Sequence, residues 1–222
     1  MTEVTESLAE RYAALAQGSP PRGRDLALRG LDVAFSTLFT VVSLPVQLAI
    51  ALTILVTSGR PILYRGERVG REGRVFTMLK FRTLAPDAET RLGPYLEEEL
   101  VRRTSAETTR LGRRLRAAQL DELPQFWNVL LGDMSFVGPR PIRPRFFEEL
   151  AADLPAYWQR LVVRPGLTGL AQLRQSRETA WAEKLAHDLE WIADRSVRLY
   201  LQTLASTAWR VLRQSLGAKV QP

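Results

Sequence analysis

A long stretch without charge constrains the fold of this chain more than any other feature. Residues 33–59 form 27 consecutive positions with no acidic or basic side chain, between Asp32 and Arg60. As a single helix this stretch would be about 40 Å long, more than the roughly 30 Å hydrocarbon core of a bilayer. A charge-free run of this length rarely lies inside a small soluble domain. The sequence therefore predicts a membrane segment.

Pro45 divides this segment into pieces of 12 and 14 residues. Proline removes a backbone hydrogen bond and kinks or breaks a helix, and each piece alone crosses only about half a bilayer. Arginines flank both ends, and the positive-inside tendency places both flanks on the cytoplasmic side. We therefore expect a re-entrant helix–break–helix, with a kinked, tilted transmembrane helix as the alternative. The flanking arginines are Arg22, Arg24 and Arg29 before the segment and Arg60, Arg65, Arg68, Arg71 and Arg74 after it.

The remaining chain has the pattern of one folded domain. We expect an α+β, mostly helical protein with an N-terminal arm (1–24), a re-entrant membrane helix broken at Pro45 (25–59) and a cytosolic catalytic domain (60–222). Residues 61–70 and 74–82 alternate like strands and predict a short β-hairpin that turns around Gly70 to Gly73. Helical patterns at 87–116, 123–131, 145–160 and 178–216 predict surface amphipathic helices, the second of them ending at Gly132 as a C-cap.

The composition limits the chemistry of any active site. With no cysteine and a single histidine, His187, the chain has no Cys nucleophile and no multi-His metal site. Catalysis must rest on carboxylates, hydroxyls, lysine and arginine. The net charge is +7, and all but three of the 31 basic residues are arginines, whose guanidinium groups suit phosphate oxygens. No recognition motif for nucleic acid accompanies this charge.

Two adjacent acids precede the predicted helix at 123–131. Asp121 or Glu122 could cap this helix, and Pro124 suits its first turn. Alternatively, the two carboxylates divide the work of phosphoryl transfer, one attacking phosphorus and the other holding a divalent cation. The spacing alone favours the cap.

Three further stretches combine basic residues or glycines with turn chemistry. They could bind phosphate through guanidinium groups and backbone amides, or they could be only tight turns. The stretches are Lys80-Phe-Arg-Thr83, Gly132 to Pro141, and Arg164 to Gln172.

The block DELPQFWNVLLGDMSFVGPRP, from Asp121 to Pro141, resembles the signature of the bacterial sugar transferases, the monotopic polyprenyl-phosphate phosphoglycosyl transferases. Lys80-Phe-Arg-Thr, Gly112-Arg-Arg-Leu-Arg116 and Arg164 to Gln172 are similar to other blocks of that family. The resemblance runs from about Asp25 to Arg213, and the chain is similar to the minimal form of the family.

The resemblance implies transfer of a sugar 1-phosphate from a UDP-sugar to polyprenyl (undecaprenyl) phosphate, with release of UMP. It implies a first membrane step of a bacterial surface glycan pathway, such as exopolysaccharide or O-antigen synthesis, at the cytoplasmic face of the inner membrane. The expected partners are a UDP-sugar, polyprenyl phosphate, membrane lipid and a second copy of the chain in a homodimer, and not nucleic acid. The alternative is a non-catalytic membrane scaffold of a glycan-assembly complex.

The resemblance also implies roles for single residues. Asp121 would be the nucleophile that forms a covalent phosphosugar intermediate, Glu122 would help to bind Mg²⁺, and Pro45 would break the membrane helix. The chain departs from the family pattern at Leu44, Gln119, Leu170 and Tyr200. The expected substrate- and phosphate-binding residues are Lys80, Arg82, Arg116, Gly138, Pro139, Arg140, Arg164, Thr168 and Gln172.

Overall fold

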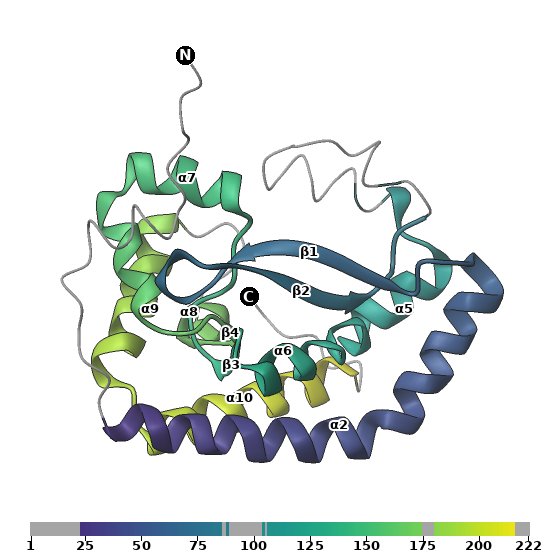
Figure 1. Ribbon diagram of the computed structural model, residues 1–222, viewed down its shortest axis with the longest axis horizontal. Helices are drawn as coiled ribbons and strands as arrows, with labels where there is room; N and C mark the ends of the chain where they lie inside the picture. The colour runs from purple at the N-terminus through teal and green to yellow at the C-terminus, as the bar shows by residue number, and fades with distance from the viewer. Residues whose placement is uncertain (1–22, 86–87, 89–103, 105, 175–179, 216–222) are drawn as a thin grey trace.

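The charge-free stretch lies in one long helix. In the computed structural model, which describes residues 23–85, 88, 104, 106–174 and 180–215, helix α2 spans Gly23–Ser58 and continues through Pro45. Figure 1 shows that α2 bends part-way along, so that its two parts follow different sides of the molecule. The predicted break is thus a bend within one helix, because proline removes a single hydrogen bond of the helix. By its length and apolar composition α2 is able to cross a membrane, which indicates membrane association.

One face of α2 packs on the rest of the protein, both before and after Pro45. Leu28 joins a core cluster with Met134 and Tyr200, whereas Ile50 and Ile54 pack with Phe81 and Leu115 in another. The other faces expose apolar side chains, which suits contact with lipid. The buried face consists of Leu28, Asp32, Ser36, Thr40, Gln47, Ile50 and Ile54. The exposed side chains include Val33, Leu38, Val41, Val42, Leu48, Leu52 and Val56.

The predicted β-hairpin is confirmed. Strands β1 (Leu63–Val69) and β2 (Val75–Phe81) pair antiparallel, with Leu63 opposite Phe81 and Val69 opposite Val75. A 3₁₀ turn, η1 (Arg71–Gly73), joins them, and its central residue Glu72 has a left-handed φ of 58°. In Figure 1 the hairpin crosses the middle of the domain, with α6 between it and the first part of α2.

Helices surround the hairpin, as expected for a mostly helical α+β fold. The chain order after β2 is α5 (Arg110–Ala117), η2 (Leu120–Glu122), α6 (Gln125–Leu131), β3 (Ser135–Val137), α7 (Pro144–Asp153), η3 (Pro155–Val162), β4 (Gly166–Thr168), α8 (Leu170–Arg174), α9 (Trp181–Asp194) and α10 (Val197–Ser215). Gly132 caps α6 with φ 94°, as predicted.

Three predicted elements differ from the structure. The stretch 145–160 divides at Leu154 into α7 and η3, and 178–216 divides at Arg195, whose ψ of 124° is extended. In the stretch 87–116, Thr108 pairs with Leu84 in a β-bridge, so α5 begins only after it. Residues 89–103 of that stretch and most of the predicted N-terminal arm lie outside the described residues.

A second, parallel strand pair was not predicted. β3 and β4 pair with Ser135 opposite Gly166, where the sequence indicated only turns. A Cβ atom on Gly166 would lie 2.1 Å from the backbone nitrogen of Gly138, and one on Gly138 would lie 2.4 Å from the carbonyl oxygen of Arg164. Glycine is therefore needed at both positions, because any side chain would collide with the neighbouring backbone. In the sequence alone, the same glycines indicate turns.

Candidate active site

Asp121 and Glu122 lie in η2, the 3₁₀ turn immediately before α6. The N-cap position of α6 is Pro124, and no side chain makes a capping hydrogen bond there or at the start of η2. The capping role considered from the sequence is therefore wrong. Neither carboxylate therefore forms a capping hydrogen bond to α6.

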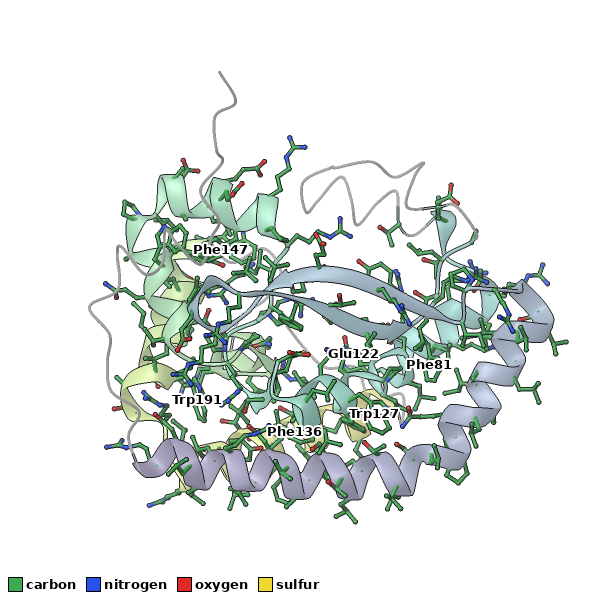
Figure 2. All side chains as sticks on the ribbon, in the orientation of Figure 1. Phe81, Glu122, Trp127, Phe136, Phe147 and Trp191 are labelled. Carbon is green, nitrogen blue, oxygen red and sulfur yellow. The ribbon has the colours of Figure 1, made fainter. Side chains whose placement is uncertain are left out.

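The hairpin places Lys80 against this acid pair. Lys80 Nζ lies 2.5 Å from Glu122 Oε1. Asn128 holds β2 against α6, since its Oδ1 accepts a hydrogen bond from the Leu79 backbone nitrogen and its Nδ2 donates to the Thr77 carbonyl. Figure 2 shows Glu122 between the hairpin and α6. Asn128 is thus a positioning residue that the sequence reasoning missed, although a polar side chain within an apolar helix segment was a visible indication.

Asp121 is buried, with 7% of its surface exposed. Burial raises the pKa of its carboxyl, Lys80 lowers it, the adjacent Glu122 raises it and Arg116 lowers it. The backbone nitrogen of Asp121 itself donates a hydrogen bond to this carboxylate, which also lowers the pKa. A desolvated carboxylate held between two cations is a suitable nucleophile for an electrophilic phosphorus.

Arg116 reaches the site from α5. Its Nε donates to Thr83 Oγ1 over 2.8 Å, and it acts electrostatically on Asp121. The structure therefore brings together four of the predicted site residues: Lys80, Arg116, Asp121 and Glu122.

Arg82 has a different position from its neighbour Lys80. Its side chain is 8% exposed and donates to the carbonyl oxygens of Ser58, Gly59 and Arg60. Carbonyls at a helix C-terminus carry partial negative charge, so a guanidinium group there stabilises the helix end. These contacts attach the end of α2 to the hairpin.

Replacing Arg82 with Met is expected to lower the free energy of unfolding by about 2–3 kcal/mol, because charge-assisted hydrogen bonds to buried carbonyls are lost. Thermal melting in detergent micelles measures this effect. The matched control is Arg65→Met, on the exposed face of β1. A folded, stable Arg82→Met protein that lost only phosphate binding would instead support the phosphate role expected from the sequence.

The loop after β3 carries Gly138, Pro139 and Arg140. Backbone hydrogen bonds from Gly138 N to Thr168 O and from Gly166 N to Pro139 O, both 2.9 Å, fix it against β4. The Arg140 side chain is exposed beyond this pairing. Its position is therefore set by the parallel strand pair.

The predicted residues from 164 to 172 make contacts within the fold. Arg164 Nε donates to Gly132 O, and Thr168 Oγ1 lies 2.7 Å from Thr207 Oγ1 of α10. The side-chain amide of Gln172 has buried nitrogen and oxygen atoms without partners, beside Gly169. Of these three residues, Gln172 alone presents side-chain polar atoms that the described residues leave unsatisfied.

Tyr200, one of the departures from the family pattern, joins α10 to α2. It is completely buried, and its hydroxyl donates to Asp32 Oδ1 over 2.8 Å. The same oxygen accepts from Ser135 Oγ and the Phe136 backbone nitrogen. This network attaches α2 to β3 and α10. Leu170 is also buried, Gln119 has a left-handed φ of 55°, and Leu44 is exposed on α2.

Comparison with known proteins identifies the family of the chain. The family described as bacterial sugar transferase matches residues 24–214. A UDP-glucose:undecaprenyl-phosphate glucose-1-phosphate transferase of Caulobacter vibrioides is 40% identical over 191 residues, covering 82% of this chain and 70% of the relative. A UDP-N-acetylgalactosamine-undecaprenyl-phosphate N-acetylgalactosaminephosphotransferase of Aeromonas hydrophila is 32% identical, covering 86% of this chain and 44% of the relative.

A third relative, a UDP-glucose:undecaprenyl-phosphate glucose-1-phosphate transferase of Klebsiella pneumoniae, is 34% identical over 200 residues. This match covers 86% of the chain but 42% of the relative, so the chain spans less than half the length of two of these three proteins. In all three, the matched part is most of this chain. The chain therefore belongs to the bacterial sugar transferase family.

Proposed function

We propose that this protein transfers a sugar 1-phosphate from a UDP-sugar to undecaprenyl phosphate and releases UMP. Its membership of the family and the reactions named for its relatives support this reaction. The observation that carries the proposal is the buried carboxylate of Asp121, beside the Lys80–Glu122 ion pair and not used as a helix cap. Burying an acid costs stability, which a non-catalytic scaffold would have no reason to retain.

We propose two displacements at Asp121. In the first, a carboxylate oxygen attacks the sugar-bearing phosphorus of the donor, the bond from that phosphorus to the bridging oxygen breaks, and UMP leaves with that oxygen. In the second, an oxygen of undecaprenyl phosphate attacks the same phosphorus, and the bond to Asp121 breaks and restores the carboxylate. Lys80 and Arg116 would neutralise charge on the phosphoryl oxygens during both steps.

The residues of this site are compatible with Mg²⁺. The described residues contain no cluster of three or more potential metal-ligating side chains, but Mg²⁺ commonly takes only one or two carboxylates and completes its shell with water and phosphate oxygens. Glu122 would help to hold the ion. When bound, Mg²⁺ supplies positive charge that stabilises the leaving diphosphate oxygens.

We also propose that α2 is re-entrant and that the domain faces the cytoplasm. The bend of α2 and the arginines on both flanks support this topology. Tags at both ends should then be accessible from the cytoplasmic side only, and opposite-side labelling would contradict it. A homodimer and the particular glycan pathway stay predictions.

The test of the reaction uses purified protein, Mg²⁺, undecaprenyl phosphate and a panel of UDP-sugars that includes UDP-glucose and UDP-N-acetylgalactosamine. UMP release with at least one donor is expected. Mass spectrometry of protein mixed with that donor alone should detect a phosphosugar adduct on Asp121. Absence of UMP release with every donor would contradict the proposed function.

The activity should also depend on pH through Asp121. Because burial raises the pKa of its carboxyl, the nucleophile takes up a proton at a higher pH than an ordinary carboxyl does. As the pH falls, kcat/KM should therefore decrease with a midpoint above pH 3.9, the usual pKa of Asp. Since Lys80 lowers this pKa, Lys80→Met should move the decrease to still higher pH, whereas Lys184→Met on α9 should not. A decrease in kcat/KM with its midpoint at pH 3.9 or below would contradict a raised pKa of Asp121.

A further inference from the structure

Three arginines meet near the turn end of the hairpin. The Val69 backbone nitrogen donates to the Ile142 carbonyl over 2.9 Å, and this antiparallel bridge sets Arg68 opposite Arg143. Residues opposite one another in an antiparallel pair have Cβ atoms about 5 Å apart. The positive charges of Arg143 and Arg140 both act electrostatically on the guanidinium group of Arg68. Arg68, Arg140 and Arg143 are called the arginine cluster below.

No acid balances the arginine cluster. Among the described residues, no carboxylate forms an ion pair with any of its three members. Burial lowers the pKa of Arg68, Tyr64 raises it, and Arg143 and Arg140 lower it. Like charges placed opposite each other are destabilising. The fold therefore holds three cations together at a cost that a bound anion would offset.

Another group of arginines shows the contrast. Arg71 lies 3.0 Å from Glu72, and Arg164 donates to the Gly132 carbonyl. Arg29 donates to two further carbonyls near the end of α6. Arg29 and Arg164 are therefore satisfied by the protein itself, whereas the buried Nε of Arg71 has no partner among the described residues.

Within the arginine cluster, Arg68 Nη1 donates to the Glu67 carbonyl and Arg68 is hydrogen-bonded to Tyr64. The side chains of Arg140 and Arg143 make no hydrogen bond or ion pair among the described residues, so these two indicate the ligand.

The backbone of the arginine cluster is held from two sides. The Val69–Ile142 bridge holds one side, and Arg160 Nη2 donates to the Arg140 carbonyl over 3.0 Å on the other. Arg160 is itself fixed by a buried ion pair with Asp188. A site whose backbone is already fixed loses little conformational entropy when it binds an anion.

The arginine cluster shares one face of the hairpin with the acid pair. Tyr64 and Arg68 lie on the same face of β1, and Tyr64 is opposite Lys80. A Cβ atom on Gly66 would lie 2.2 Å from the Tyr64 hydroxyl oxygen, so the absence of a side chain lets the Tyr64 ring extend over the strand toward Arg68. Four residues of strand separate the Cα atoms of Tyr64 and Arg68 by about 13 Å. Gly66 and Met78 between the two places are buried, so a substrate that contacts both would pass along the Tyr64 ring.

We propose that Arg68 and Arg143, together with Arg140, bind a phosphate group of a substrate that lies along this hairpin face. The proposal rests on the function proposed above for its choice of substrates. The phosphate group belongs either to the nucleotide diphosphate of the donor or to the lipid phosphate of the acceptor. The guanidinium groups bind the same chemistry in both cases.

The test measures binding directly, so that it does not depend on turnover. Calorimetry with the full chain in micelles gives the Kd of UDP, and titration with undecaprenyl phosphate in the same micelles gives the Kd of the lipid. Arg68→Gln and Arg143→Gln are each expected to weaken binding of one of the two ligands by roughly tenfold. The matched control, Arg65→Gln, removes a charge from the exposed, opposite face of the same strand and should change neither Kd by more than about twofold.

The two arms identify the source of the phosphate. Weaker UDP binding assigns the arginine cluster to the donor, and weaker lipid binding assigns it to the acceptor. Because each substitution removes a like charge, the Tm should stay the same or rise, which a purely structural role of either arginine would not produce. Unchanged Kd values in both folded variants, or a parent protein that binds neither ligand, overturn the inference. The proposed function is tested separately, by UMP release from the parent protein, so its failure is distinguishable from failure of this inference.

Discussion

Asn in place of Asp121 is expected to lower the rate of UMP release by at least about 10⁴-fold while raising the Tm at neutral pH. The loss of rate follows because the amide has no anionic oxygen to attack phosphorus. The gain in stability follows from burial, which raises the pKa of Asp121 and thus makes its ionised form unfavourable in the folded protein. A buried carboxylate that serves as a nucleophile therefore lowers the stability of the folded protein while it makes the reaction possible.

The pH dependence of the Tm distinguishes this account from a change in packing. Since its pKa is raised on folding, the Asp121 carboxyl binds a proton more tightly in the folded than in the unfolded protein. Its destabilising effect is therefore absent below the unfolded pKa of about 3.9 and complete at pH values above the folded pKa. The Tm gain of Asp121→Asn should be largest near pH 7 and should shrink toward pH 4.

Asp153→Asn is the matched control, because Asp153 is exposed at the end of α7 and should affect neither the rate nor the Tm. Undiminished UMP release from Asp121→Asn would contradict the proposed role of Asp121 as the nucleophile. A lower Tm at every pH would show that the lost rate reflects damaged packing.

Local patterns in the sequence predicted the parts of the fold that depend on neighbours in the chain. The hairpin follows from alternation in two short segments, and the end of α6 follows from Gly132, which adopts the left-handed conformation that a C-cap needs. The bend in α2 follows from Pro45. Each of these three features depends on residues that are close together in the chain. The amino-acid sequence alone is therefore enough to predict them.

Contacts between distant segments were not predictable in the same way. Glycines 138 and 166 indicated turns, but they permit a strand pair whose other half is about 30 positions away. Arg82 and Lys80 look equivalent in the sequence, yet one stabilises the end of α2 and the other contacts Glu122. Which carbonyl or carboxylate a long basic side chain reaches depends on packing that periodicity does not describe.

The same limit applies to Arg160 and Asp188, which form a buried ion pair between η3 and α9. Their side chains are 4% and 5% exposed, and Arg160 Nη2 lies 2.7 Å from Asp188 Oδ2. The same guanidinium group donates to the Tyr157 hydroxyl and to the Arg140 carbonyl. The pair therefore links the helical core to the loop that carries Arg140.

Replacing Asp188 with Asn is expected to lower the free energy of unfolding by about 3–5 kcal/mol, because it leaves a buried guanidinium group without its counter-ion. For a protein of this length, that loss corresponds to a decrease in Tm of roughly 6–20 °C. Thermal melting measures it. The control is Glu149→Gln, which removes the partner of Arg145 in an exposed ion pair on α7 and should cost at most about 0.5 kcal/mol.

A double substitution separates stability from positioning. Both charges of the pair are taken out of water, and well-packed apolar side chains of similar volume avoid that desolvation cost. The apolar pair Arg160→Met with Asp188→Leu should therefore recover much of the stability that Asp188→Asn loses. It cannot recover the hydrogen bond to the Arg140 carbonyl, so substrate KM should stay raised while the Tm returns. Full recovery of both quantities would show that Arg160 serves packing alone, and a Tm within 2 °C of the parent for Asp188→Asn would contradict the buried pair itself.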